Sequence, residues 1–249
     1  WVKVAGGVLV GGFFVWQAWP FFFSERPRAQ PVVTVTPAPA PVQRVALAPA
    51  QDWRGAFDQA RSALNESRLA DAEGLFRQSL AFVEKEHGAE HPAAGVVLHQ
   101  LALTYERRQR PADQEATLKR ALAVFERHRP REAKAALGTL GNFVDKENVA
   151  RYLGDMYWDR RNYGESFVYF RKAHDAALEV DVEPEIRNMK RAYTSAGVMK
   201  TACMIGQWAI ADDAMAELKR RYPTVSASTQ RYLKYWIETG EPRLQARRC

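Results

Sequence analysis

Two histidines, each directly preceded by a glutamate, form the pattern in this sequence that comes closest to a metal site. His87 and His91 are four residues apart. Histidine nitrogens and carboxylate oxygens are common zinc ligands, and that spacing would suit one face of a helix. However, Gly88 and Pro92 follow the two histidines, and such residues end one helix and begin the next. No third ligand is evident. We therefore predict no metal site, and we expect no cofactor.

The sequence also lacks a motif for covalent or acid–base chemistry. It contains no glycine-rich phosphate loop, no nucleophile elbow and no paired-carboxylate pattern. The other histidines, His99, His128 and His174, are isolated from one another. We therefore assign no catalytic residues and predict that the protein is not an enzyme.

The two cysteines, Cys203 and Cys249, have neither metal-ligand spacing nor a redox motif. Cys203 falls in a predicted helix and Cys249 is the last residue of the sequence. We expect no disulfide framework, so the fold should be held by its apolar core and not by oxidation.

Apolar residues recur at offsets of three and four, which places them on one face of a helix and predicts pairs of helices. Small residues stand where two helices would touch. The two clearest sets are Leu98, Leu101, Ala102 and Tyr105 followed by Leu118, Ala121 and Leu122, and Ala150, Leu153, Gly154 and Tyr157 followed by Tyr163, Phe170 and Ala173. Since strand signals are scarce after residue 50, we predict an all-α body.

This pattern resembles the tetratricopeptide repeat (TPR), whose helical hairpins bury their apolar faces only against neighbouring hairpins. The resemblance covers roughly residues 52–223, and the repeat length is similar to that of kinesin light chains. It implies a TPR-like α-solenoid within a domain spanning 52–240. The expected hairpins lie at 52–86, 93–128, 147–178 and 185–223, with an extra helix in 131–146, a capping helix at 229–237 and a basic tail at 241–249.

Residues 4–23 are almost entirely apolar, and Gln17 is their one strongly polar side chain. Twenty helical residues span roughly 30 Å, which is the hydrocarbon thickness of a bilayer. We therefore predict a transmembrane helix within residues 1–24. Gly7 and Gly11 form a small-residue pair that would let another membrane helix pack closely. Residues 25–51 are rich in proline and are predicted to form an extended linker.

The resemblance also implies a binding surface, because in TPR proteins the first helix of each hairpin lines a concave groove. Its arginines and aromatic residues would suit an extended or helical peptide that carries acidic residues. The alternative is that these side chains simply face solvent or a neighbouring helix. The positions assigned to the groove are Arg54, Phe57 and Arg61 in the first hairpin, His99, Leu103 and Arg107 in the second, and Arg151, Asp155 and Trp158 in the third.

The chain has 36 basic and 29 acidic residues, a formal net charge of +7. Nucleic acid, anionic lipid or an acidic protein surface could each match that charge. Most of the basic clusters fall near predicted helix ends, where cations complement the helix dipole. No RNA-binding aromatic motif accompanies them, so nucleic acid is not the expected partner. We expect the partners to be other protein subunits and the lipid bilayer.

Together these features predict a non-catalytic, membrane-anchored TPR scaffold. The first hypothesis is an accessory or structural subunit of a large membrane complex of the respiratory or ATP-synthase type. It would contact other subunits through its membrane helix and its repeats. The sequence lacks an initiator methionine, as after removal of a presequence, which favours the mitochondrial inner membrane. The alternative is a membrane-tethered adaptor, assembly factor or receptor that recruits clients through the groove, either in an organelle or at a bacterial inner membrane with a periplasmic domain.

Overall fold

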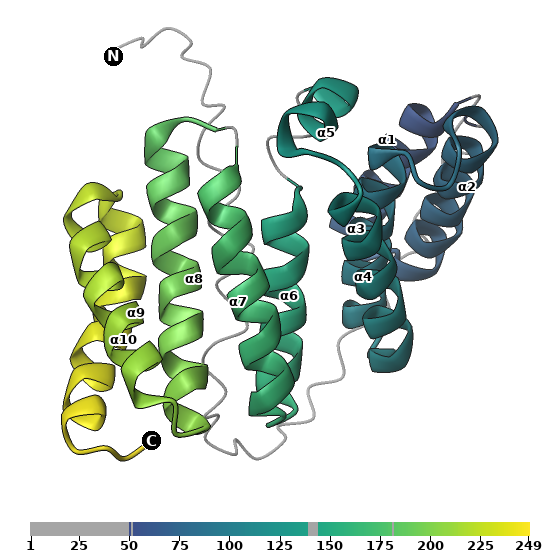
Figure 1. Ribbon diagram of the computed structural model, residues 1–249. Helices are drawn as coiled ribbons and strands as arrows, with labels where there is room; N and C mark the ends of the chain where they lie inside the picture. Colours follow the sequence, from purple (N-terminus) through teal and green to yellow (C-terminus); the bar gives the residue numbers. More distant parts are fainter. Residues whose placement is uncertain (1–49, 51, 139–143, 181) are drawn as a thin grey trace, which may run out of the picture. The chain divides into compact units, whose positions relative to one another are not determined.

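The computed structural model describes residues 50, 52–138, 144–180 and 182–249, and every regular element in those ranges is helical (Figure 1). Most of the helices form consecutive hairpins. The hairpins are α1 (Trp53–Asn65) with α2 (Leu69–His87), α3 (Pro92–Arg107) with α4 (Pro111–Glu126), α6 (Lys146–Asp159) with α7 (Tyr163–Glu179), and α8 (Pro184–Met204) with α9 (Trp208–Arg221). The remaining elements are α5 (Pro130–Leu137), the 3-10 turn η3 (Tyr222–Thr224) and α10 (Ala227–Gln245).

Each hairpin packs against the next through the second helix of one and the first helix of the following one. The contacts run α2 with α3, α4 with α6, and α7 with α8, after which α10 packs on α8 and α9. This side-by-side arrangement is the packing expected of a repeat solenoid. The predicted all-α, TPR-like class is therefore confirmed for the described part of the chain.

The predicted transmembrane helix at 1–24, with Gly7 and Gly11, lies outside the described residues. So does the proline-rich linker at 25–51, apart from Ala50. Among the helices that the structure describes, none has both the length and the apolar character needed to cross a bilayer.

The turn inside each hairpin has one residue in the left-handed region. These residues are Ser67 (φ 60°), Gln109 (φ 56°), Arg161 (φ 58°) and Gly206 (φ 73°). In each case the next amide donates to the carbonyl five residues earlier, as from Arg110 to Tyr105 at 2.9 Å. This bond satisfies a carbonyl that the end of a helix would otherwise leave free. The same turn therefore sets the course of all four hairpins.

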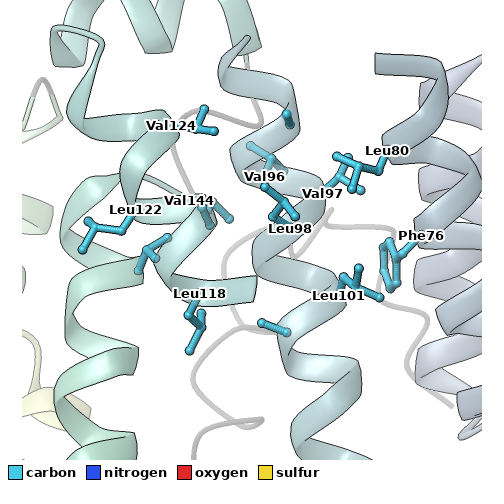
Figure 2. Packing of buried hydrophobic residues seen from close by; sticks show 14 of the residues in the cluster. Phe76, Leu80, Val96, Val97, Leu98, Leu101, Leu118, Leu122, Val124 and Val144 are labelled. Atoms are coloured by element: carbon cyan, nitrogen blue, oxygen red, sulfur yellow. The ribbon is translucent and has the colours of Figure 1, made fainter. Parts of the chain in front are cut away.

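The first core cluster fills the space between α1, α2, α3, α4 and α6. Figure 2 shows Phe76 and Leu80 of α2 pointing toward Val97 and Leu101 of α3. Phe76 and Val97 are completely buried. A second cluster spans α7 to α10 and includes Met199, Met215 and Leu233. Each hairpin thus buries its apolar face against its neighbours.

The ring of Phe170 of α7 lies against Gly154 of α6 and Gly197 of α8. Its side chain is 2% exposed. A Cβ atom added at Gly154 of α6 would lie 3.0 Å from the ring, and one at Gly197 of α8 would lie 2.2 Å from it. Such a contact is far closer than van der Waals packing permits, so the absence of a side chain at residue 197 is what allows α8 to pack on α7.

Two buried or partly buried glutamates join neighbouring hairpins. Glu73 of α2, with a side chain 4% exposed, pairs with Arg77, Arg108 and Arg110. Glu115 of α4 accepts a hydrogen bond of 2.6 Å from the hydroxyl of Tyr157 and pairs with Arg160. In both cases a glutamate on the second helix of one hairpin binds arginine at the turn of the next.

Helix α10 is longer than the predicted capping helix and runs on to Gln245, into the segment expected to be a basic tail. The helix continues because Gly240 and Leu244 are buried. A Cβ at Gly240 would lie 2.9 Å from the Met199 methyl group and 3.0 Å from that of Met215, so glycine lets α10 approach α8 and α9. Helix α5, at Pro130–Leu137, begins one residue before the predicted extra helix at 131–146 and ends well before its predicted end.

The expectation that no disulfide holds this fold is wrong for the structure. Cys203 and Cys249 are bonded, with their Cα atoms 5.8 Å apart. The bond joins α8 to the segment that follows α10. It becomes possible because α10 packs beside α8, which brings together two cysteines that are 46 residues apart in the sequence.

Candidate functional site

The predicted groove residues of the third hairpin lie together on one face of α6. Arg151, Asp155 and Trp158 follow one another at offsets of four and three, which places them on one side of the helix. The guanidinium of Arg151 lies 3.5 Å from the Asp155 carboxylate and 3.5 Å from that of Glu147. We call the surface that includes this face of α6 and the adjoining surfaces of α3, α8 and α10 the inner face.

Lys200 of α8 reaches the same place and is enclosed by aromatic rings. Its ammonium lies 4.5 Å from the ring centroid of Trp158, 4.8 Å from that of Phe170 and 5.2 Å from that of Trp236. It is also 3.4 Å from the Asp155 carboxylate, and its side chain is 5% exposed. We call these five residues the Lys200 cluster. Burial lowers the pKa of Lys200, although Asp155 opposes that effect.

The Lys200 cluster connects four helices, since Trp158 and Asp155 come from α6, Phe170 from α7, Lys200 from α8 and Trp236 from α10. A cation over the face of an aromatic ring is attracted by the negative charge of that face, more strongly when water is excluded. The ammonium thus holds the capping helix α10 onto the inner face.

A second buried charge, Lys190, lies at the other end of α6 and α8. Its ammonium is 2.5 Å from the carboxylate of Glu147 and 2.9 Å from the amide oxygen of Asn148. Glu147 is 1% exposed. Burial disfavours the charged ammonium, but Glu147 and Asp145 outweigh it and raise the pKa of Lys190. Lys190 is therefore a structural cation held by its neighbours.

His99 of α3 is fully buried and faces Tyr152 of α6, with their ring centroids 4.9 Å apart. Burial lowers the pKa of His99 to about 3, so the imidazole is neutral at physiological pH. Its Nε2 atom has no hydrogen-bond partner within the described part of the chain. His99 therefore fills a contact between α3 and α6.

The groove positions of the first hairpin are not brought into contact with the Lys200 cluster by any interaction that the structure records. Phe57 is 3% exposed and packs edge-on against Phe76, so it belongs to the core. The Arg54 guanidinium lies 4.5 Å from the Trp53 ring centroid, and that of Arg61 lies 5.9 Å from the Phe57 centroid. These two arginines cover core aromatic residues.

The remaining groove positions give the inner face a mixed charge. Leu103 is half-buried, and exposed Arg107 donates a 2.9 Å hydrogen bond to the carbonyl of Leu64. Glu106 and Asp159 form no ion pair within the described residues. Burial raises the pKa of Glu106, helped by Asp159 and Asp155, and burial and Asp155 likewise raise the pKa of Asp159.

The arginines predicted to make the groove mildly basic are thus engaged with the protein itself. Between α3 and α6 the inner face also presents the carboxylates of Glu106 and Asp159, and Trp158, which precedes Asp159 in the sequence, is half-buried. Of these four arginines only Arg151 forms an ion pair within the described residues, so the charge predicted for the groove stays a prediction.

Of the two histidines that resembled a metal site, His87 is the last residue of α2 and His91 directly precedes α3. Their rings stack with centroids 4.7 Å apart. His91 is the N-cap of α3, and its Nδ1 accepts a 3.2 Å hydrogen bond from the amide of Ala93. In the described ranges no three histidine, cysteine, aspartate or glutamate side chains are placed to share a metal ion.

Two cavities in the described part of the chain lie away from the predicted groove residues. One, of about 50 Å³, lies beneath α5 and is lined mainly by apolar residues such as Phe125, Leu137 and Val180. The other is an open hollow between α9 and α10 that includes Met215 and Leu244. Neither of these two cavities contains a residue of the Lys200 cluster.

Comparison with known proteins agrees with the helix packing. The family described as "Tetratricopeptide repeat" matches residues 55–127, which are the first two hairpins. Among solved structures, BtubC (BKLC) from P. vanneervenii is 14% identical, with a TM-score of 0.54 over 68% of this chain. The match covers 62% of BtubC, so the chain spans less than two thirds of that structure.

A kinesin light chain from Podosopora anserina with nearly identical TPR-like repeats also matches, with 15% identity and a TM-score of 0.43, over 78% of this chain and 94% of that one. A comparison with curated protein sequences found no match. The family match over residues 55–127 and the likeness to BtubC thus agree on a TPR-like fold for the described helices.

Proposed function

We propose that this protein is a non-catalytic scaffold that binds a protein partner along the inner face of α3, α6 and α8. The observation that carries the proposal is the row of first helices in a TPR-like stack, with the half-buried Trp158 next in sequence to Asp159, whose carboxylate forms no ion pair in the described residues. Tryptophan, tyrosine and arginine supply most of the binding energy at protein interfaces, and the inner face is rich in all three.

The partner segment would lie across α3 and α6, beside Trp158, Glu106 and Asp159. Two carboxylates that have no ion pair of their own favour a segment with a basic residue at that point. A basic side chain there would also relieve the repulsion between Glu106 and Asp159. The fit is thus better for a basic residue than for the acidic peptide expected from the arginine positions.

We further propose that residues 1–24 anchor the protein in a membrane, because residues 4–23 have the length and apolar character of a spanning helix. The protein would then be an accessory or structural subunit of a large membrane complex of the respiratory or ATP-synthase type, in the mitochondrial inner membrane. Gly7 and Gly11 would pack against a neighbouring membrane helix. The alternative is a membrane-tethered adaptor, assembly factor or receptor that recruits clients through the inner face.

Blue-native electrophoresis of membranes solubilised in mild detergent, with mass spectrometry of the band that contains this chain, distinguishes these proposals. A fixed ratio to the subunits of a large membrane enzyme supports the structural subunit. A small band with variable partners supports the recruiting adaptor. A chain that migrates alone, and that stays in the soluble fraction, contradicts both.

The inner face is tested with the double variant Glu106→Gln, Asp159→Asn. We expect it to lose at least tenfold in affinity for the partner identified in the native band. The matched control is Asp213→Asn, which removes one exposed carboxylate from α9, a second helix of a hairpin. Equal affinity of the double variant and the control would refute binding at this face.

A further inference from the structure

The chain that follows α10 turns back in the same way as the chain inside each hairpin. Arg247 has φ 52°, in the left-handed region that the four hairpin turns also use. The amide of Arg248 donates to the carbonyl of Arg243 at 3.0 Å, and that of Arg247 to the carbonyl of Leu244 at 3.1 Å. Backbone hydrogen bonds alone therefore direct the segment after α10.

Side-chain contacts then fix this segment on α9. The Arg247 guanidinium lies 2.9 Å from the Asp212 carboxylate and 5.6 Å from the ring centroid of Trp208. Trp208 is the first residue of α9, close in sequence to the end of α8. Figure 1 marks the C-terminus at the same end of the helix stack as the last turn of α8. These non-covalent contacts thus position Cys249 near Cys203.

The two sulfurs differ in their access to solvent. Cys203 lies in the last turn of α8 and is 5% exposed, whereas Cys249 is exposed. Their Cα separation of 5.8 Å falls in the range found for disulfides. An external thiol or disulfide therefore meets the sulfur of Cys249, while Cys203 reacts only with its partner in the chain.

Helix α10 contributes few residues to the hydrophobic core. It buries four residues, Thr229, Leu233, Gly240 and Leu244, whereas α8 buries twelve. In the described ranges α10 packs mainly against α8, α9 and η3. A covalent tie at the end of α10 therefore adds to a weakly packed element.

We propose that the Cys203–Cys249 disulfide is a redox-controlled clasp that holds the capping helix α10 on α8 and keeps Trp236 in the Lys200 cluster. The bond closes in an oxidising compartment, such as a periplasm or an intermembrane space, and opens where thiol reductants are abundant. Trp236 and Lys200 belong to the inner face. The redox state of Cys203 and Cys249 therefore controls whether Trp236 is held in that face.

The clasp closes by two thiol–disulfide exchanges with an oxidising disulfide, for example oxidised glutathione or an oxidoreductase. The Cys249 thiolate attacks the external disulfide, and one external thiolate leaves. The Cys203 thiolate then attacks the sulfur of Cys249 and displaces the second external thiolate. Two thiols lose two electrons and two protons, and the external disulfide becomes two thiols. A reducing thiol opens the clasp by the reverse steps.

Hydrogen–deuterium exchange of the full chain in mild detergent tests the proposal, with the oxidised and the reduced protein compared side by side. We expect reduction to speed exchange at least tenfold in peptides from residues 227–249 and to leave peptides from residues 53–126 unchanged. Cys249→Ser should exchange like the reduced protein and should not respond to the reductant. This variant changes an exposed residue, so folding of the repeats is not at risk.

Thiol counting by alkylation and mass spectrometry gives the second measurement. After treatment with oxidised glutathione, the wild-type chain should have no free thiol and a cross-linked peptide that contains Cys203 and Cys249. Two free thiols after this treatment would overturn the proposal. So would equal exchange of residues 227–249 in the oxidised and reduced chains.

Discussion

Gly197→Ala is the substitution that most directly tests the packing of the third and fourth hairpins. In an exposed helix interior, glycine to alanine stabilises by about 1 kcal/mol because alanine loses less backbone entropy. At residue 197, however, the new Cβ would lie 2.2 Å from the Phe170 ring. The ring is 2% exposed and has Gly154 on its other side, where a Cβ would itself lie 3.0 Å away.

The ring therefore has no free space, and α7 and α8 must separate. Overpacking a core by a methyl group costs about 1–3 kcal/mol, and a contact this short belongs at the upper end. Subtracting the helix-propensity gain leaves a net destabilisation of about 2 kcal/mol. For a domain of this size each kcal/mol shifts Tm by about 2–4 °C, so Tm should fall by about 4–8 °C.

Gly74→Ala is the matched control, because Gly74 is exposed in α2 and a Cβ there would meet nothing within 4 Å. It should raise Tm by about 2–4 °C, as the helix propensity alone predicts. Thermal melts followed by circular dichroism at 222 nm measure both variants. If Gly197→Ala is as stable as Gly74→Ala, the proposed contact between α8 and Phe170 is refuted.

Three further predictions concern charge and oxidation. Hydrogen bonds from Lys119 and Tyr157 lower the pKa of Glu115 to about 2. The ionised Glu115 therefore stabilises the fold fully above pH 4.5, and this stabilisation is lost as the pH falls through 2. In urea unfolding, the stability difference between the wild-type chain and Glu115→Gln should shrink as the pH falls from 4.5 to 2. Burial holds the pKa of His99 near 3 in the folded chain, so between pH 6.5 and 3 the unfolded chain binds a proton at His99 that the folded chain does not. The free energy of unfolding should therefore decrease as the pH is lowered from 6.5 to 3. His99→Gln should reduce that slope by about 1.4 kcal/mol per pH unit. Reduction of the Cys203–Cys249 bond, which joins residues 46 apart in the sequence, should destabilise the chain by about 2–4 kcal/mol, and an unchanged melting curve in reductant would contradict that expectation.

The hairpins could be predicted from sequence because their signals are local. Offsets of three and four mark the buried faces, and Gly88 with Pro92 marks the turn between α2 and α3. The turns inside the hairpins were harder to see, since three of their four left-handed residues are not glycine. Only Gly206 carries the residue type that this backbone conformation normally favours.

The Lys200 cluster could not be predicted because it is assembled from four helices. Its geometry depends on how α6, α7, α8 and α10 pack, which no local pattern contains. One signal was present: Lys200 is the only charged residue between Arg191 and Asp212 in the sequence. A single cation in a long run of small and apolar side chains indicates burial with a partner.

Phe57 shows the limit of carrying a family's groove positions onto one chain. The position corresponds to a groove residue in other TPR proteins, but here a phenylalanine gains more by packing against Phe76 than by facing solvent. The disulfide was missed for a related reason: the proximity of Cys203 and Cys249 depends on α10 lying beside α8 and on the backward turn at Arg247.

The glutamate–arginine pairs between neighbouring hairpins form both with and without the inserted helix α5. Glu73 and its partner Arg108 are 35 residues apart, whereas Glu115 and Arg160 are 45 apart. The additional residues include α5, which contacts α3 while α4 packs directly on α6. The insertion therefore leaves the contact between hairpins intact, and the same ion pair forms across both junctions. The sequence separation of the two partners differs between these two junctions, but the glutamate–arginine contact is the same.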